Sequence, residues 1–347
     1  MRLVQLHDED WDSGIAHYAV TLAAALRSRG HDVQFWSRAG SYSAAQGRTA
    51  GLEVREISGS WTSLPELRAE LGRRGTQLIN AHTGSAHSLA AALAAGTEIK
   101  VVRTRGDTRP PKRHFLAQAL ARRTDAYIAA NRHLRDGLLE AFPDARVELV
   151  FQGIAPLGAP APLPVGSATV GILGRLDPVK GHVILMEAAA QLSRNFSSAA
   201  YLAAGTGKPD RLVELNAKVL SLGLEGCFEF LGQVADVAAF INRCSVGVVA
   251  SNGSEAVSRA ALEWMQLGRP VVATHVGCLP DIVEEGRTGL LIPPNDAQAM
   301  AKALTRLFCD PKEAAEMGRR GRERFGKCFS LERFAEETEN VYKSVLA

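Results

Sequence analysis

Short apolar runs alternate with amphipathic stretches along most of the chain. The apolar runs cover residues 3–6, 33–36, 78–81, 99–102, 127–130 and 147–151 in the first half, and residues 168–173, 199–203, 227–230, 246–250, 270–274 and 289–292 in the second. Stretches with helical spacing lie between them, among them residues 15–26 and 184–192. This alternation is typical of βαβ units. The pattern therefore predicts an α/β protein with parallel sheets.

The segment 154–164 interrupts the alternation. It combines five residues that favour bends or polyproline conformation with no charged residue, as is typical of a linker. We therefore expect two Rossmann-like, doubly wound lobes. The first domain would cover residues 1–154, a linker residues 155–165 and the second domain residues 166–328. A C-terminal helix over residues 329–347 would pack back on the first domain.

Composition and charge narrow the class of protein. The 347 residues suffice for two domains, and a net charge of +3 is too small for a dedicated nucleic-acid binder. Residues 1–154 hold 20 basic and 16 acidic side chains, so the first half is the basic half. The five cysteines show no C-x-x-C spacing, which fits a reducing cytoplasm. Neither a signal peptide nor a membrane-spanning run is evident, so any membrane contact should be peripheral.

Ligands of open parallel sheets bind outside the carboxyl ends of the strands, and two such lobes would place them in the interdomain cleft. The first strand of the second lobe is followed by Gly174-Arg-Leu-Asp-Pro-Val-Lys-Gly181. Arg175 and Lys180 are suited to phosphate oxygens, and the flanking glycines admit close approach of the backbone. The loop is a candidate diphosphate site, and a solvated turn is the alternative.

The next strand of this lobe ends in Gly205-Thr-Gly207, before Pro209. The spacing permits close approach of a ligand. Because the third glycine of a dinucleotide motif is missing, NAD binding is disfavoured. A plain turn is the alternative.

A helix is predicted from Ser254, as its N-cap, to Gly268 at its end. Glu255 would lie at the mouth of this helix, and Glu263 about 80 degrees further round it. Both carboxylates could then meet different parts of one long ligand, with vicinal sugar hydroxyls as suitable partners. The alternative is that Glu255 complements the helix dipole and Glu263 is a surface acid.

Six motifs occur in one order over residues 168–295. They are the loop 174–181, Ala-Gly-Thr-Gly at 204–207, Phe-Leu-Gly-Gln-Val at 230–234, the acids Glu255 and Glu263, Gly-Arg-Pro-Val-Val-Ala at 268–273 and Gly-Arg-Thr-Gly-Leu-Leu-Ile-Pro at 286–293. Their order and spacing resemble the retaining glycosyltransferases of the GT-B fold, family 4 (glycosyl transferases group 1). The first lobe resembles this family more loosely, through Ser13-Gly14, residues 29–33 and His82.

The resemblance implies a role for each matching residue. The second domain would bind the nucleotide sugar, with Arg175 and Lys180 on the diphosphate, Glu263 on the ribose and Glu255 on the transferred sugar. The first domain would bind the acceptor. The other implied substrate contacts are Gly174, Gly205 and Gly207, with Gly232 and Val234 at the base, and Gly14 and His82 from the first lobe.

Two positions depart from the family's pattern. A Gly-Gly pair is usual where Ser13-Gly14 stands, and a Gly-Phe-Gly-like run is usual where residues 256–259 read Ala-Val-Ser-Arg. Arg259 could add a third cation near the donor. The departures leave the diphosphate role of Arg175 and Lys180 unchanged and concern the identity of the donor sugar.

His82 follows the apolar run 78–81, where its side chain would look into the cleft. We expect a neutral ring that donates a hydrogen bond to a sugar hydroxyl, with a structural histidine as the alternative. Asp8-Glu9-Asp10 matches the D-x-D pattern with which another glycosyltransferase fold binds a metal. Because the cations of the second lobe already compensate a diphosphate, we expect neither a metal nor a cofactor.

The segment 103–114 carries five cationic residues and one acid. Arg103 and Arg105 in this segment are candidates for an anionic acceptor or anionic lipid, and a solvated loop is the alternative. Aromatic residues do not interleave with the cations, which disfavours single-stranded nucleic acid.

Together these features predict a retaining glycosyltransferase that moves a sugar from a nucleotide-diphosphate sugar to a glycan or glycolipid in cell-envelope biosynthesis, such as that of lipopolysaccharide or exopolysaccharide. The protein would be cytoplasmic and peripheral on the inner face of the membrane. The sequence offers no clear carboxylate nucleophile, and the resemblance implies a same-face route in which the leaving phosphate takes the acceptor's proton. Two alternatives stay open: an epimerase or phosphorylase of the same fold, and a non-catalytic nucleotide-sugar-binding protein.

Overall fold

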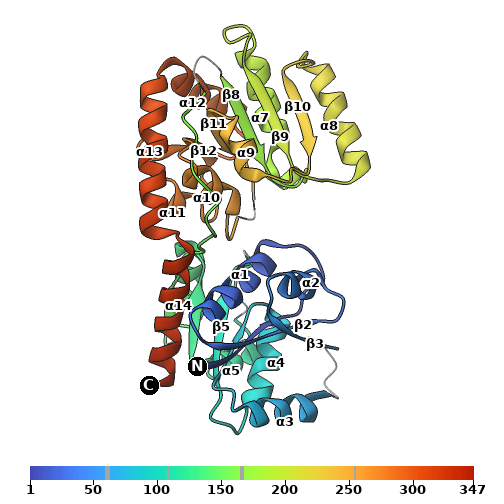
Figure 1. The fold of residues 1–347 in the computed structure, drawn as a ribbon, viewed down its shortest axis with the longest axis vertical. Helices are drawn as coiled ribbons and strands as arrows, with labels where there is room; N and C mark the ends of the chain where they lie inside the picture. Colours follow the sequence, from blue (N-terminus) through green and yellow to red (C-terminus); the bar gives the residue numbers. More distant parts are fainter. Residues whose placement is uncertain (59–62, 108, 112, 165–167, 254) are drawn as a thin grey trace. The chain divides into compact units, whose positions relative to one another are not determined.

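The structure is a computed structural model that describes residues 1–58, 63–107, 109–111, 113–164, 168–253 and 255–347. The chain divides into two compact units (Figure 1). Unit 1 comprises Met1–Gly153 and Leu331–Ala347, and unit 2 comprises Ile154–Ser330. The start of the proline-rich segment belongs to unit 2, where the Gln266 side chain donates to the Ala155 carbonyl over 3.1 Å. Among the described helices, none combines the length and hydropathy required to cross a bilayer.

Unit 1 contains a seven-stranded parallel sheet in the order β3-β2-β1-β4-β5-β6-β7. The strands are β1 (Arg2–His7), β2 (Asp32–Arg38), β3 (Glu53–Ile57), β4 (Leu78–Ala81), β5 (Lys100–Arg105), β6 (Ala126–Ala129) and β7 (Val147–Leu149). The helices are α1 (Gly14–Ser28), α2 (Tyr42–Thr49), α3 (Leu64–Arg74), α4 (Gly84–Ala94), α5 (Phe115–Ala121), α6 (Arg132–Ala141) and α14 (Leu331–Leu346).

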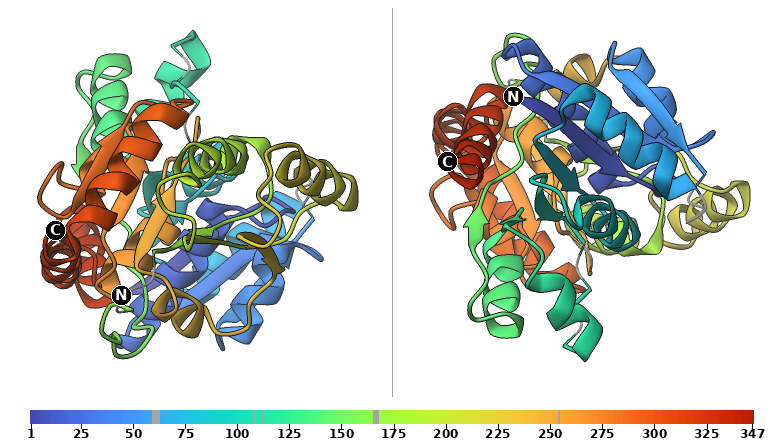
Figure 2. Two further views of the ribbon diagram at one scale, coloured as in Figure 1. Left: turned by 90° about the horizontal axis from the view of Figure 1, so that it is seen from above. Right: turned by 90° about the horizontal axis from the view of Figure 1, so that it is seen from below.

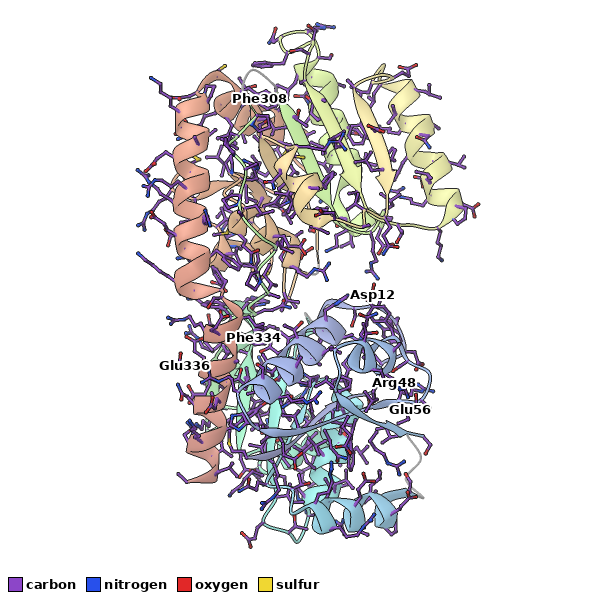
Figure 3. All side chains as sticks on the ribbon, viewed as in Figure 1. Asp12, Arg48, Glu56, Phe308, Phe334 and Glu336 are labelled. Carbon is purple, nitrogen blue, oxygen red and sulfur yellow. The ribbon has the colours of Figure 1, made fainter. Side chains whose placement is uncertain are left out.

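Helices cover both faces of this sheet (Figure 2). Val4 and Leu6 of β1 belong to the core that also contains the buried residues of α3 and α4. Because successive strand residues point to opposite faces, Gln5 turns to the other face. There its side chain donates a hydrogen bond to the Tyr342 hydroxyl of α14. Phe334 of the same helix (Figure 3) packs edge-on against Tyr18 of α1, with 4.7 Å between the ring centroids.

Strand β3 is not predicted by the apolar runs. It is an edge strand whose residues are mostly half-exposed, and three of its five residues are charged. Its acidic residues form ion pairs with arginines, for example Glu56 Oε1 with Arg48 Nη2 at 2.7 Å (Figure 3). Charged side chains on an edge strand discourage pairing with other chains.

Unit 2 contains a six-stranded sheet in the order β10-β9-β8-β11-β12-β13. The strands are β8 (Thr169–Leu173), β9 (Ala200–Ala204), β10 (Phe228–Gly232), β11 (Val246–Val249), β12 (Val271–Thr274) and β13 (Gly289–Ile292). The helices are α7 (His182–Leu192), α8 (Pro209–Ser221), α9 (Val237–Asn242), α10 (Arg259–Gln266), α11 (Leu279–Ile282), α12 (Ala297–Cys309) and α13 (Pro311–Cys328), with a 3-10 turn, η2 (Pro178–Lys180), before α7. Both units are therefore α/β with parallel sheets, as predicted.

The indole of Trp264 lies against two paired glycines at the centre of this sheet. Gly171 of β8 is the register partner of Gly247 of β11. A Cβ atom at Gly171 would lie 2.4 Å from Trp264 Cη2, and one at Gly247 would lie 2.2 Å from Trp264 Cδ2. The missing side chains therefore allow α10, which carries Trp264, to approach the two central strands.

We predict that Gly247→Ala lowers the free energy of unfolding of unit 2 by about 1–3 kcal/mol, because the added methyl group overlaps the indole. Urea denaturation monitored by tryptophan fluorescence measures the change. Gly326→Ala is the matched control, since a Cβ atom at that position of α13 meets nothing within 4 Å. The control should be as stable as the original protein or slightly more stable, and equal loss in both variants would contradict the packing argument.

Candidate functional site

The strand order of unit 2 creates a switch point between β8 and β11. From β8 the chain continues to β9 and β10, whereas β11 leads in the opposite direction to β12 and β13. The carboxyl ends of strands at such a point are where open α/β sheets bind ligands. Arg175 and Lys180 follow β8, and Glu255 follows β11. The strand order therefore brings these predicted site residues to one edge of the sheet.

Lys180 and Glu255 form an ion pair. Glu255 is 1% exposed, and its carboxylate accepts hydrogen bonds from Lys180 Nζ and from the Ser251 hydroxyl. A buried carboxylate requires such partners. The Lys180 side chain remains 27% exposed. Sequence reasoning did not select Ser251, although a polar residue directly after the apolar run 246–250 was a usable signal.

Glycines let the loops around this ion pair come together. Gly181 has φ 71°, and a Cβ atom there would lie 1.9 Å from the Ala250 carbonyl oxygen. Gly277 has φ 55°, and its Cβ atom would lie 2.0 Å from the Glu255 carbonyl oxygen. That oxygen accepts a hydrogen bond from the Cys278 N–H over 2.7 Å. Backbone contacts thus hold the Glu255 main chain in place.

Gly205 and Gly207 provide close contacts inside the protein. A Cβ atom at Gly205 would lie 1.9 Å from the Gly174 carbonyl oxygen, and one at Gly207 would lie 2.6 Å from Leu176 Cβ. Packing between the loops after β8 and β9 therefore explains both glycines without a ligand.

Gly232 is the last residue of β10, next to Gly205, and Val234 follows this strand. The Gly232 carbonyl accepts from the Gly205 N–H over 2.8 Å. Gly232 is exposed with φ 64°, and a Cβ atom there would meet nothing within 4 Å, whereas Val234 is half-buried. Space for a ligand is thus available at Gly232.

The helix predicted to begin at Ser254 begins instead at Arg259, so the prediction that Glu255 lies on it is wrong. Ser254 itself lies outside the described residues. The partners of Glu255 explain the difference, since its carboxylate and carbonyl are both used in contacts with other loops. The predicted 80-degree relation between the two acids therefore does not hold. Gly268 follows the end of α10 with φ 68°, as predicted.

Glu263 lies on α10 and pairs with Arg259 of the first turn. Arg259 Nε lies 2.8 Å from Glu263 Oε1, and Glu263 is 5% exposed. Burial raises the pKa of Glu263, and the neighbouring Arg259 guanidinium opposes this rise. Arg259 is therefore already matched by an acid before any ligand binds.

Arg175 points to solvent, with 54% of its side chain exposed, and its Nη2 lies 3.0 Å from Asp177 Oδ2. Sequence reasoning did not select Asp177, although it lies two residues away in the same loop. Three predicted cations of unit 2 thus each have a carboxylate partner. An ammonium group has three N–H donors, so Lys180 can keep Glu255 and still bind phosphate oxygens.

Unit 1 has its own switch point, between β1 and β4. The hydroxyl of Thr83, after β4, donates to the carboxylate of Asp8, after β1. Gly14 is the exposed first residue of α1, and the Ser13 side chain caps this helix by accepting from the Ala16 N–H over 3.2 Å. The departure at Ser13 from the usual Gly-Gly pair therefore has a local structural role.

The two aspartates of the D-x-D sequence have separate partners. Asp8 binds Thr83, whereas Asp10 pairs with Arg38 at 3.1 Å. Within the described ranges, no group of three or more histidines, cysteines or acids is arranged to hold a metal ion.

His82 directly follows β4, is 1% exposed and belongs to a buried polar network. Its Nε2 lies 2.8 Å from Gln5 Oε1. Asn80 Nδ2 donates both to this oxygen, over 3.1 Å, and to the Tyr342 hydroxyl, over 2.7 Å. Tyr342 also accepts from Gln5 Nε2 over 3.1 Å. The last helix of the chain thus helps to position His82.

This network selects one tautomer of His82. Because Gln5 Oε1 can only accept, Nε2 must carry the proton and Nδ1 must not. Nδ1 is buried and has no hydrogen-bond partner within the described part of the chain. Burial, with His7 and Arg103 nearby, holds the pKa of His82 well below its usual value. The ring is neutral as expected, but its unused nitrogen can only accept a hydrogen bond, where the sequence analysis expected a donor.

The structure corrects the prediction that Arg103 and Arg105 belong to a basic loop. Both belong to strand β5. Arg103 is 3% exposed, and its guanidinium donates to the carbonyls of Ala81, over 3.0 Å, and Thr104. Burial lowers the pKa of Arg103 to about 10, so it stays charged. Arg105 pairs with Asp107 at 3.0 Å. The guanidinium of Arg103 is therefore used in contacts inside unit 1, and little of its surface is accessible to an acceptor.

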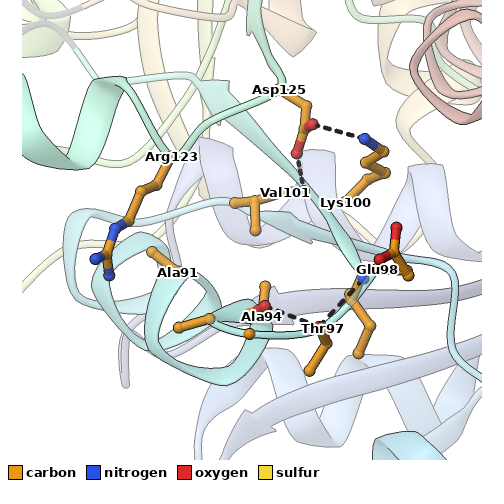
Figure 4. Close-up of a pocket in the computed structure, with 11 residues that line it drawn as sticks. Ala91, Ala94, Thr97, Glu98, Lys100, Val101, Arg123 and Asp125 are labelled. Carbon is orange, nitrogen blue, oxygen red and sulfur yellow. Dashed lines mark hydrogen bonds and ion pairs between the residues drawn. The ribbon is translucent and has the colours of Figure 1, made fainter.

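A cavity of about 340 Å³ lies at the opposite edge of the unit 1 sheet, at the amino ends of β5 and β6 (Figure 4). Lys100 and Asp125 line it and pair at 3.3 Å, and Asp125 also accepts from the Val101 N–H over 2.8 Å. The charged groups of Lys100 and Asp125 in the cavity wall are thus already paired. Since it lies away from the carboxyl ends of the strands, it does not form part of the candidate site.

Family profiles match both halves of the chain. The profile described as "Glycosyltransferase Family 4" matches residues 13–156, and the one described as "Glycosyl transferases group 1" matches residues 167–310. The chain belongs to this glycosyltransferase family. The resemblance based on the motifs of the second lobe is thereby confirmed. The match of the first lobe, which rested on few motifs, covers most of that lobe.

Curated relatives of this family member carry several glycosyltransferase names. The lipopolysaccharide core biosynthesis mannosyltransferase LpcC of Rhizobium leguminosarum bv. viciae is 28% identical over 202 residues, which cover 57% of this chain and 56% of the relative. Alpha-maltose-1-phosphate synthase of Mycolicibacterium smegmatis is 31% identical over 257 residues, 64% of either chain. The matched region thus spans about half to two thirds of these relatives.

Solved structures show the same fold. Anabaena HepE in complex with UDP superposes with a TM-score of 0.88 at 20% identity, covering 99% of this chain and 100% of HepE. A glycosyltransferase from Rickettsia africae ESF-5 gives a TM-score of 0.90 at 16% identity, covering 99% and 98%. The α/β fold of the chain is therefore GT-B, as the resemblance implied.

The network around His82 yields a prediction for Tyr342→Phe. Without the hydroxyl, Gln5 and Asn80 lose an acceptor and can rotate, so His82 should change from one Nε2-protonated tautomer to a mixture of both. ¹⁵N NMR of the ring nitrogens measures the tautomer, and the ring should stay neutral at pH 6.5, where an ordinary histidine is about half protonated.

Tyr18→Phe is the matched control for this experiment. The ring centroids of Tyr18 and His82 are 5.9 Å apart, and the Tyr18 hydroxyl has no hydrogen-bond partner within the described ranges. The control should keep the Nε2-protonated ring. A proton on Nδ1 in the unaltered protein would show that the inferred network is incorrect.

Proposed function

We propose that the protein is an enzyme that transfers a sugar, with retention of configuration, from a nucleotide-diphosphate sugar to a glycan or glycolipid acceptor in cell-envelope biosynthesis. The observation that carries the proposal is the ion pair of Lys180 and Glu255 at the switch point of unit 2, with Arg175 in the same loop as Lys180. It is supported by relatives whose names include a lipopolysaccharide core mannosyltransferase, and by a structure of Anabaena HepE described as a complex with UDP-glucose.

Unit 2 would bind the donor. Arg175 is exposed and can turn from Asp177 to the diphosphate, while Lys180 shares its donors between Glu255 and a phosphate oxygen. The first turn of α10 lacks a side-chain cap, so its N–H groups can face an anion. Glu263 accepts the ribose hydroxyls, and Glu255 accepts hydroxyls of the transferred sugar.

In the reaction, the bond between the anomeric carbon and the phosphate oxygen breaks, and a bond to the acceptor oxygen forms on the same face of the sugar. The acceptor's proton passes to the departing phosphate oxygen, so no protein carboxylate is needed beneath the sugar. Negative charge grows on the leaving diphosphate in the transition state. Lys180 and Arg175 lower the barrier because they stabilise that charge more than the charge of the bound donor.

Unit 1 would bind the acceptor, and His82 would bind a sugar hydroxyl. Its Nδ1 is the ring nitrogen left to accept a hydrogen bond. Because this atom is buried, a sugar reaches it only when neighbouring side chains move. The enzyme would work in the cytoplasm, on an acceptor that is anionic or attached to lipid.

We predict that the two acids affect binding of free nucleoside diphosphate differently. Glu263→Gln should weaken binding about tenfold, a loss of about 1.4 kcal/mol, because the ribose loses a charged acceptor. Glu255→Gln should leave this affinity within about threefold, since the transferred sugar is absent from that ligand, but should lower turnover. Calorimetry with UDP, GDP, ADP and TDP identifies the nucleotide and then measures both variants.

Glu225→Gln is the control, at an exposed position in the turn before β10. It should bind and turn over like the original protein. Equal weakening in the Glu263 and Glu255 variants would contradict the assignment of different roles.

We propose further that the reaction needs neither a metal nor a cofactor, because Arg175 and Lys180 take over the neutralisation of the diphosphate. Treatment with EDTA should leave the initial rate of transfer unchanged, and added magnesium should not raise it. A rate that falls to background with EDTA and returns with magnesium would refute this proposal.

A further inference from the structure

Helix α5 presents an apolar surface that unit 1 does not cover. Phe115 is 79% exposed and Leu116 is 71% exposed, the highest values for large hydrophobic side chains in the described part of the chain. No residue of α5 is buried. The two residues are consecutive in the first turn, so both exposed apolar side chains lie at the same end of the helix.

Polar contacts attach this helix to its neighbour α6. Arg113, just before α5, pairs with Glu140 at 2.7 Å, and Gln118 donates to the Ala141 carbonyl over 3.1 Å. Phe115 and Leu116 take part in neither contact. The helix is thus held in place while its apolar residues stay available.

Basic residues surround these apolar side chains. Residues 109–123 contain five lysines and arginines and no acid. Arg109, Arg113, Arg122 and Arg123 are exposed. Arg122 still has helical backbone angles and follows Phe115 by seven residues, or about two turns, so the two side chains share one stripe of the helix.

We infer that this α5 surface, formed by Arg109, Arg113, Phe115, Leu116 and Arg122, docks on an anionic lipid bilayer. Aromatic and aliphatic side chains inserted beside cations are the features by which interfacial helices bind such membranes. The charge complementarity favours anionic headgroups. Two apolar side chains are too few for the core of a stable protein interface, which normally needs far more buried area.

The position of α5 in unit 1 indicates what docking on a membrane would contribute to the reaction. The helix belongs to the crossover from β5 to β6 of unit 1, and Arg113 and Gln118 attach it to the last turn of α6. Docking through α5 would hold unit 1, to which we assign acceptor binding, at the surface that carries a lipid-linked acceptor. This contribution rests on the proposed function, whereas docking itself does not.

Co-sedimentation of the full chain with vesicles tests the inference. The unaltered protein should bind phosphatidylcholine vesicles that contain phosphatidylglycerol at least tenfold more tightly than pure phosphatidylcholine, and salt should weaken this binding. Phe115→Ser with Leu116→Ser should reduce binding tenfold or more. Arg122→Gln with Arg123→Gln should reduce it and flatten the dependence on salt.

Leu212→Ser with Val213→Ser on α8 is the matched control, since these side chains are 37% and 70% exposed in unit 2. This variant should bind vesicles like the original protein. Equal loss in both serine variants, equal binding to neutral and anionic vesicles, or no binding would overturn the inference. A Phe115- and Leu116-dependent dimer without vesicle binding would also overturn it, in favour of a protein contact.

Nucleoside diphosphate affinity measured on the same variants separates this inference from the proposed function. It should stay unchanged in the variants at positions 115, 116, 122 and 123, because these positions lie outside unit 2. Vesicle binding without any nucleotide binding would leave the docking surface standing and reject the proposed enzyme.

Discussion

The buried charge of Glu255 is the constraint on which the candidate site depends. A carboxylate that is 1% exposed is tolerable only with a cation and further donors beside it, and Lys180 and Ser251 supply them. These contacts join the loops after β8 and β11, at the point where the strand order of unit 2 reverses. The site is therefore organised before any ligand arrives, with its lysine at the switch point where open α/β sheets bind ligands.

Glycines, which lack a side chain, are as important for this arrangement as the charged residues. Gly181 and Gly277 let neighbouring loops reach Ala250 and Glu255, and Gly171 and Gly247 make room for Trp264. The first pair fixes the loop that carries Glu255, and the second brings α10, with Glu263, against the central strands. Fold and site are thus coupled, because the same central strands that form the core of unit 2 also end in the residues of the site.

The repeating apolar runs were sufficient to predict the parallel sheets and most strands, since buried parallel strands are continuously apolar. They missed β3, in which three of the five residues are charged, as is compatible with its place at a sheet edge. The start of α10 was misplaced because Ser254 and Glu255 resemble a helix cap, whereas the contacts of Glu255 with residues far away in sequence prevent a helix there. The burial of Arg103, and the link from Tyr342 to Asn80 across 262 positions, likewise depend on tertiary packing that local spacing does not encode.

The central claim is that the carboxyl edge of unit 2 holds a nucleotide diphosphate between the ends of β8 and β11. A crystal structure of the chain with the nucleoside diphosphate that binds it tests this most directly. We predict density for the two phosphates within hydrogen-bond distance of Lys180 and Arg175, with the ribose at Glu263. Phosphates bound at the amino ends of the strands, or in the cavity of unit 1 beside Lys100, would contradict the account.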